Sequence, residues 1–174
     1  MRVVYNPNDD VSLARIINEP KRKIGNATLE KARNIAREKE TSLYDVISNA
    51  DDYPEFKTAI KKLLSFSEII QSLIKLKDTV TIEELTGRIL NDTGYMPALV
   101  MEDTTESKTR IENLGEFISV ITEFEKNEET GNTLGGFLEN ISLVSDIDGY
   151  DENEDSAVLM TIHSAKGLEF PIVF

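Results

Sequence analysis

Apolar residues recur every three or four positions along most of the chain, which is the spacing of an amphipathic helix. The clearest stripe follows Pro54 and consists of Phe56, Ile60, Leu63, Leu64, Ile70, Leu73 and Ile74. A second stripe lies between Lys108 and Lys126 and consists of Ile111, Leu114, Phe117, Ile118, Ile121 and Phe124. The pattern predicts two long helices, the first with Pro54 near its first turn, within a mainly α fold.

Start and stop signals predict several shorter helices, at residues 11–17, 28–39, 43–48, 82–93 and 134–143. Their expected N-terminal caps are Asp9 or Asp10 for the first helix, Thr41 or Ser42 for the third, and Thr81 for the fourth. Thr81 opens a capping-box pattern with Glu84, and Gly94 can close the same helix.

The composition of the chain changes near its C-terminal end. Residues 146–155 are strongly acidic and predict an exposed loop or linker. Residues 157–162 predict a strand, and a second apolar run occupies residues 171–174. Because two short strands do not form a stable sheet alone, we expect their partners to lie outside this chain. The sequence therefore predicts a fragment of a longer protein.

Composition narrows the class of protein. The 174 residues are 40% hydrophobic and 29% charged, as in soluble globular domains. The absence of Cys excludes disulfides and thiolate metal sites, and a single His excludes a multi-His site. No signal peptide and no apolar run long enough to span a bilayer is visible. We expect a cytoplasmic protein with no membrane partner.

Charge is distributed unevenly along the chain, whose net charge is −13. Between Ser12 and Glu40, eight basic residues face four acidic ones, whereas residues 41–174 hold ten basic and 26 acidic residues. Phosphate binding depends on clustered Lys and Arg. Any contact with nucleic acid is therefore expected near the N-terminal end.

A polar turn joins the two predicted strands: Thr161-Ile162-His163-Ser164-Ala165-Lys166-Gly167-Leu168-Glu169-Phe170-Pro171. From the residues alone, this turn is either a strand end that contacts a ligand or a capped turn with surface charges. Residues 158–171 closely resemble motif V of the UvrD/PcrA/Rep group of superfamily 1 DNA helicases. Residues 6–22, 110–117 and 137–146 resemble other parts of the same proteins.

The resemblance implies a domain organisation. In that family, two RecA-like domains, 1A and 2A, hold ATP and move along single-stranded DNA, and a mostly helical domain 2B is inserted in 2A. It implies that residues 1–15 are a remnant of 2A, residues 16–150 are 2B, and residues 151–174 are a linker and a 2A segment with motif V. The expected fold is a helical accessory domain with a short two-strand remnant of a RecA-like α/β domain. The implied parent is an ATP-dependent 3′ to 5′ DNA helicase of DNA repair or replication.

The resemblance also implies roles for four residues of motif V. Thr161 and His163 are expected to contact single-stranded DNA. Gly167 and Glu169 are expected on the ATP side. ATP and Mg²⁺ are the implied cofactors of the intact parent, and none is expected in the fragment.

A basic turn after Asn18 is the second expected site. In the relatives this stretch is a helix–hairpin–helix-like element whose backbone amides meet duplex phosphates, and a helix N-terminus suits such anions. The implied duplex-contacting residues are Lys21, Arg22, Lys23, Ile24, Gly25, Thr28 and Lys31. Lys23 departs from the family pattern, which often has Gly there. The simpler alternative is a solvated basic turn.

Other expected motor elements are missing from the sequence. It has no phosphate-binding loop of the Gly-x-x-x-x-Gly-Lys-Thr/Ser type and no Walker B element. We therefore expect the chain alone neither to hydrolyse ATP nor to unwind DNA. One alternative function is a protein-interaction or autoinhibitory module recognised by repair or replication proteins. A generic helical adaptor explains the helices but not motif V.

Overall fold

The computed structural model describes residues 1–126 and 132–143, and all the elements it describes are helical. The predicted mainly α class is confirmed. Both predicted strands, at 157–162 and 171–174, lie outside the described residues. The chain divides into two compact units, Met1–Phe137 and Leu138–Phe174, and the first contains the basic turn.

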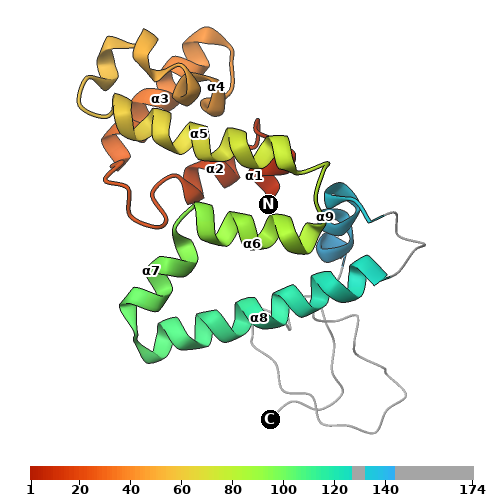
Figure 1. Cartoon of the computed structure of the whole chain (residues 1–174). Coiled ribbons are helices and arrows are strands. Elements are labelled where there is room, and N and C mark those ends of the chain that lie inside the picture. The colour runs from red at the N-terminus through yellow and green to blue at the C-terminus, as the bar shows by residue number, and fades with distance from the viewer. Residues whose placement is uncertain (127–131, 144–174) are drawn as a thin grey trace, which may run out of the picture. The chain divides into compact units, whose positions relative to one another are not determined.

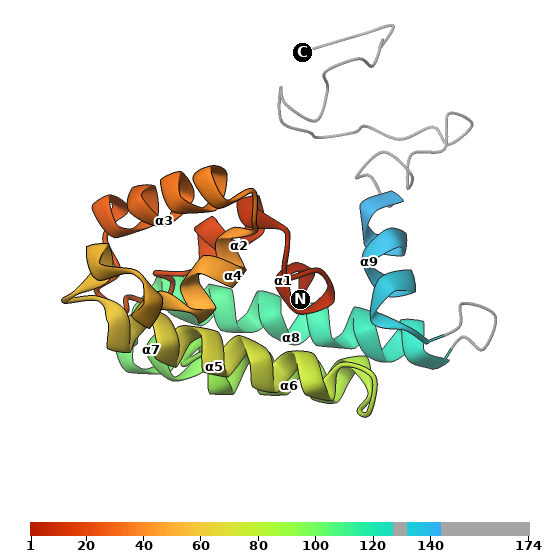
Figure 2. The same ribbon diagram turned by 90° about the horizontal axis from the view of Figure 1, so that it is seen from above.

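The N-terminal half of the first unit packs around helix α5. Short helices α1 (Arg2–Tyr5) and α2 (Asp10–Ile16) precede α3 (Asn26–Lys39) and α4 (Leu43–Ser48), and α5 spans Ile60–Leu76. α4 lies between α3 and α5, and α1 contacts α5 (Figures 1 and 2). Their shared core includes Val3, Leu13, Ile17, Ile24, Leu43, Ile47, Phe56, Leu63, Phe66 and Ile70.

The chain then folds back and forth through α6 (Ile82–Asp92), α7 (Tyr95–Glu102) and α8 (Thr105–Lys126) (Figure 1). α6 contacts α5, α7 and α8, so it links the two halves of the unit. α9 spans Leu134–Leu143. Near its start, the Phe137 ring lies 5.8 Å from that of Phe117 and 5.3 Å from that of Phe124, and this aromatic contact fastens the end of the unit to α8. None of the described helices has the length and apolarity that a bilayer span requires.

The predicted caps are confirmed where the signal was local. Asp9, Ser42 and Thr81 each accept a hydrogen bond from the backbone N–H three residues ahead. Gly94 has a φ of +78° and separates α6 from α7. This left-handed conformation is one that glycine adopts without a steric penalty.

Several helix boundaries, and two whole helices, differ from the sequence prediction. The long helix does not begin at Pro54: residues Pro54–Phe56 form a separate 3₁₀ turn, and α5 starts at Ile60. Phe56 is buried and its ring meets Tyr53 edge-on. The four-residue spacing of Phe56 and Ile60 also fits a continuous helix, so the sequence pattern did not reveal the separate turn. Helices α1 and α7 were not predicted, since α1 is one turn long and α7 is apolar around most of its circumference.

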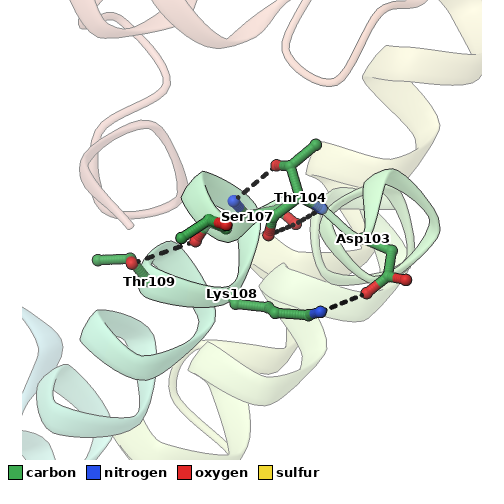
Figure 3. Close-up of polar contacts among 6 residues, drawn as sticks. Asp103, Thr104, Ser107, Lys108 and Thr109 are labelled. Carbon is green, nitrogen blue, oxygen red and sulfur yellow. Dashed lines mark hydrogen bonds and ion pairs between the residues drawn. The ribbon is translucent and has the colours of Figure 1, made fainter.

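Helix α8 begins three residues before the predicted Lys108, because its first turn carries a reciprocal cap (Figure 3). The Ser107 amide donates to Thr104 Oγ1, and the Thr104 amide donates to Ser107 Oγ, each at 3.0 Å. Asp103 pairs with Lys108 at 2.9 Å across the same turn. Ser107 thus takes the part that Glu or Gln plays in a capping box.

Candidate nucleic-acid interface

The basic turn is held from within by the side chain of Asn18. Its Oδ1 atom accepts hydrogen bonds from the amides of Arg22 (2.9 Å) and Ile24 (3.2 Å). Ile24 is 2% exposed and belongs to the core, so it anchors the turn. The turn is therefore a defined loop, which we call the basic loop (residues 20–25).

Lys23 adopts a left-handed backbone conformation with a φ of +59°. A residue with a Cβ pays a steric cost there that glycine does not. Glycine, which the resemblance leads us to expect at this position, would adopt this φ without that cost. Lys23 itself is exposed.

The side chain of Arg22 is directed into the protein. Nη1 donates to the carbonyl oxygens of Ile16 (3.1 Å), Ile17 (3.4 Å) and Pro20 (3.1 Å), and Nη2 donates to that of Thr93 at 2.7 Å. The guanidinium lies 5.3 Å from the centre of the Phe66 ring. Burial lowers the pKa of this guanidinium, and the nearby Glu19 carboxylate opposes that shift.

The N-terminal end of α3 is open. Gly25 is the N-cap residue, and no described side chain caps this end. The amides of Thr28 and Leu29 both donate to the Gly25 carbonyl, whereas those of Gly25, Asn26 and Ala27 have no acceptor among the described residues. A Cβ atom built on Gly25 would meet nothing within 4 Å. Among the described residues, the start of α3 therefore has three amides without an acceptor, and the space where a Gly25 side chain would lie is open.

Four exposed lysines lie in the basic loop, on α3 and on α5. Lys21 and Lys23 lie in the basic loop, and Lys31 lies on α3, where its Nζ is 3.4 Å from the carbonyl oxygen of Glu55. Lys62 of α5 was not among the predicted residues, yet its Nζ donates to the Lys23 carbonyl at 3.3 Å. None of these four lysines forms an ion pair with a carboxylate in the described part of the chain.

The predicted duplex-contacting residues differ in their exposure to solvent. Lys21, Lys23, Gly25 and Lys31 are exposed, Thr28 is half-buried, and Arg22 and Ile24 face inward. Thr161, His163, Gly167 and Glu169 lie outside the described residues.

The N-terminal end of α6 shows the opposite arrangement. The Glu125 carboxylate of α8 accepts hydrogen bonds from the amides of Ile82 and Glu83, and Thr81 accepts one from Glu84. A carboxylate is held there because the amide donors and the helix dipole favour negative charge. The open end of α3 offers the same chemistry without an internal anion.

Comparison with known proteins identifies the family. The family model described as the UvrD-like helicase C-terminal domain matches residues 1–174. The chain belongs to that family. It is 45% identical over 175 aligned positions to the ATP-dependent DNA helicase PcrA of Staphylococcus aureus strain Mu50 and 43% identical to that of Staphylococcus epidermidis strain ATCC 12228. Both alignments include the whole chain but only 24% of the relative, so the chain spans about a quarter of these UvrD-like helicases.

Proposed function

We propose that this chain is the 2B accessory region of an ATP-dependent 3′ to 5′ DNA helicase, flanked by segments of domain 2A. Residues 1–15 and 151–174 are the 2A segments in this proposal, and residues 16–150 are 2B. Membership of the UvrD-like helicase C-terminal family supports the proposal, as does alignment of the whole chain with proteins named as PcrA helicases.

The proposed task of the 2B region is to hold duplex DNA by its phosphates. The observation that carries this proposal is the open N-terminal end of α3, where the amides of Gly25, Asn26 and Ala27 have no acceptor among the described residues, together with lysines that form no ion pair there. Backbone amides and ammonium groups bind phosphate oxygens without reading the bases. Such a contact suits an enzyme that unwinds DNA of any sequence.

The predicted residues have different roles in this proposal. Lys21, Lys23 and Lys31 supply positive charge to the phosphates, and Gly25 permits close approach of the sugar–phosphate backbone. Ile24 and Thr28 maintain the shape of the loop and of the first turn of α3. The contact lies on the N-terminal segment whose net charge is positive, while the rest of the chain is acidic.

For the intact motor, we propose that Thr161 and His163 contact single-stranded DNA and that Gly167 and Glu169 face ATP. ATP and Mg²⁺ would be bound largely by parts of the parent that this sequence lacks. The chain alone is therefore expected to release no phosphate from ATP in the presence of DNA. Release above the level of a protein-free control would contradict this expectation.

Salt-dependent binding tests the duplex contact. The 174-residue chain is titrated with a short mixed-sequence DNA duplex at several salt concentrations, as wild type and with Lys21, Lys23 and Lys31 all changed to Glu. The slope of log affinity against log salt should fall by roughly 0.9 for each phosphate that the variant no longer neutralises. A matched control changes the exposed Lys39, Lys75 and Lys126 to Glu. Equal effects of the two triple changes would reject the site.

A second candidate function, recognition by repair or replication proteins, is favoured by the end of α7. Val100 and Met101 are 62% and 89% exposed there and are followed by the exposed Glu102, Asp103 and Glu106. Exposed apolar side chains at such a place are typical of protein contacts. Comparing duplex unwinding by the parent helicase carrying Met101→Ser with and without such a partner would separate this role from DNA contact.

A further inference from the structure

We infer that Arg22 is a positioning residue, whose guanidinium holds the basic loop in the conformation that presents the α3 amides to duplex phosphate. The inference rests on the proposed function, but it assigns Arg22 a role other than direct contact with phosphate. The sequence places Arg22 among three consecutive basic residues, where each would be expected to contact phosphate. The structure gives this arginine different surroundings from those of Lys21 and Lys23.

The donors of Arg22 are committed inside the protein. Its two terminal nitrogens reach four backbone carbonyls, and its Cζ lies 5.3 Å from the centre of the Phe66 ring. Two of these carbonyls, those of Ile16 and Ile17, belong to the C-terminal end of α2, where the helix dipole favours a cation. A phosphate would have to replace these bonds to engage the guanidinium.

The contact with Thr93 connects the basic loop to a distant part of the chain. Thr93 is the C-cap residue of α6, and its carbonyl lies 2.7 Å from Nη2 of Arg22. Pro20 also approaches Gly94, since a Cβ on that glycine would lie 3.8 Å from Pro20 Cγ. The loop is thereby fastened to the junction of α6 and α7 as well as to α2.

Arginine suits this place better than lysine does. A guanidinium has five N–H donors in a rigid plane, and an ammonium has three donors around one atom. Lysine at position 22 would keep the charge, but it could not reach carbonyls on both sides of the loop at once. Charge and geometry can therefore be separated by substitution.

The test compares Arg22→Gln and Arg22→Lys with wild type in the 174-residue chain. Duplex affinity is measured across a salt series at a temperature where every variant is folded. Both variants should bind roughly tenfold more weakly, because amide–phosphate hydrogen bonds no longer form. The salt slope should not change, because the lysines remain. Ile121→Val, a core change in α8, serves as the control of similar stability and should bind as wild type does.

Hydrogen exchange without DNA gives an independent readout. The amides of Arg22 and Ile24, both bonded to Asn18, should exchange faster in Arg22→Gln and Arg22→Lys, and as in wild type in Ile121→Val. This readout does not depend on the proposed function. If changing Lys21, Lys23 and Lys31 to Glu left duplex binding unchanged, the proposed function would fail. Hydrogen exchange would still test whether Arg22 holds the basic loop.

Four results would overturn the inference. A salt slope reduced by roughly 0.9 in Arg22→Gln would mean that Arg22 touches phosphate directly. Wild-type affinity in Arg22→Lys would mean that charge alone matters. An equal fall in affinity in Ile121→Val would mean that Arg22 only stabilises the fold. Unchanged exchange at Arg22 and Ile24 would mean that the guanidinium does not hold the loop.

Discussion

The N-terminal ends of α3 and α6 differ in whether the described residues supply an acceptor for their first backbone amides. At α6, the Glu125 carboxylate occupies the amides of Ile82 and Glu83, and the first turn carries two glutamates. At α3, the N-cap is Gly25, the first turn has no acidic residue, and Lys62 of α5 donates to the Lys23 carbonyl of the preceding loop. The first end is closed and joins two helices. The second is open and suited to an anion from another molecule.

Whether a helix N-terminus can bind an anion from another molecule therefore depends on whether the rest of the chain already supplies a carboxylate there. Helix geometry alone gives both ends free N–H donors. The long-range partner decides between structural and binding roles: Glu125 comes from 43 residues along the chain, and Lys62 comes to Lys23 from 39 residues along. Substitutions at Glu125, Gly25 and Lys23 test this difference between the two helix ends.

Removing the carboxylate should damage the closed end most. Glu125→Ala leaves two backbone amides without their acceptor, and the free energy of unfolding should fall by about 1–3 kcal/mol. Glu125→Gln should lie between this variant and wild type, because an amide oxygen still accepts. Chemical denaturation measures both. Glu123→Ala, an exposed neighbour on α8, is the control, and a fall in stability as large as that of Glu125→Ala would contradict the assignment.

Filling the open end should impair binding more than stability. Gly25→Ala adds a methyl group that meets no described atom within 4 Å beyond its chain neighbours, so the fold should lose at most about 1 kcal/mol, from a poorer N-cap. Duplex affinity should fall by roughly tenfold, because the methyl group lies where phosphate would approach. Gly87→Ala, also in open space but inside α6, should stabilise the helix and leave binding unchanged. Normal duplex binding by Gly25→Ala would remove this end of α3 from the interface.

A smaller effect is expected at Lys23. Lys23→Gly relieves the left-handed strain, and the fold should gain up to about 1 kcal/mol, whereas Lys23→Ala keeps the strain and should gain nothing. Both variants lack one charge and should lower the salt slope equally. Tighter duplex binding by Lys23→Gly than by Lys23→Ala would indicate that close backbone approach matters. Thermal unfolding of the two variants checks the stability difference, and equal midpoints would contradict the account of strain.

Sequence patterns predicted the parts of this molecule whose signals are local. The caps at Asp9, Ser42 and Thr81 and the turn at Gly94 each depend on residues a few positions apart. The basic loop was predicted from its lysines and from resemblance. Local signals therefore predicted these caps and this turn, and the candidate site came from the basic residues together with the resemblance.

The details of the site depend on contacts between residues that are far apart in the sequence. Local sequence patterns do not predict such contacts. Arg22 looks like its neighbours in the sequence, and its acceptors are backbone carbonyls, which every residue has. Lys62 reaches the loop only because α5 packs beside it. Helix α7 lacks the polar face that would have distinguished it, and its residues include Pro97.

Amide chemical shifts show whether duplex DNA binds at the N-terminal end of α3. The ¹⁵N-labelled 174-residue chain is titrated with a short DNA duplex at low salt, and the backbone N–H signals are followed. The signals of Gly25, Asn26 and Ala27 should shift with added duplex and return at high salt, while those of Ile82 and Glu83 should stay in place. Duplex binding that leaves the three α3 amides unmoved would contradict the proposed contact.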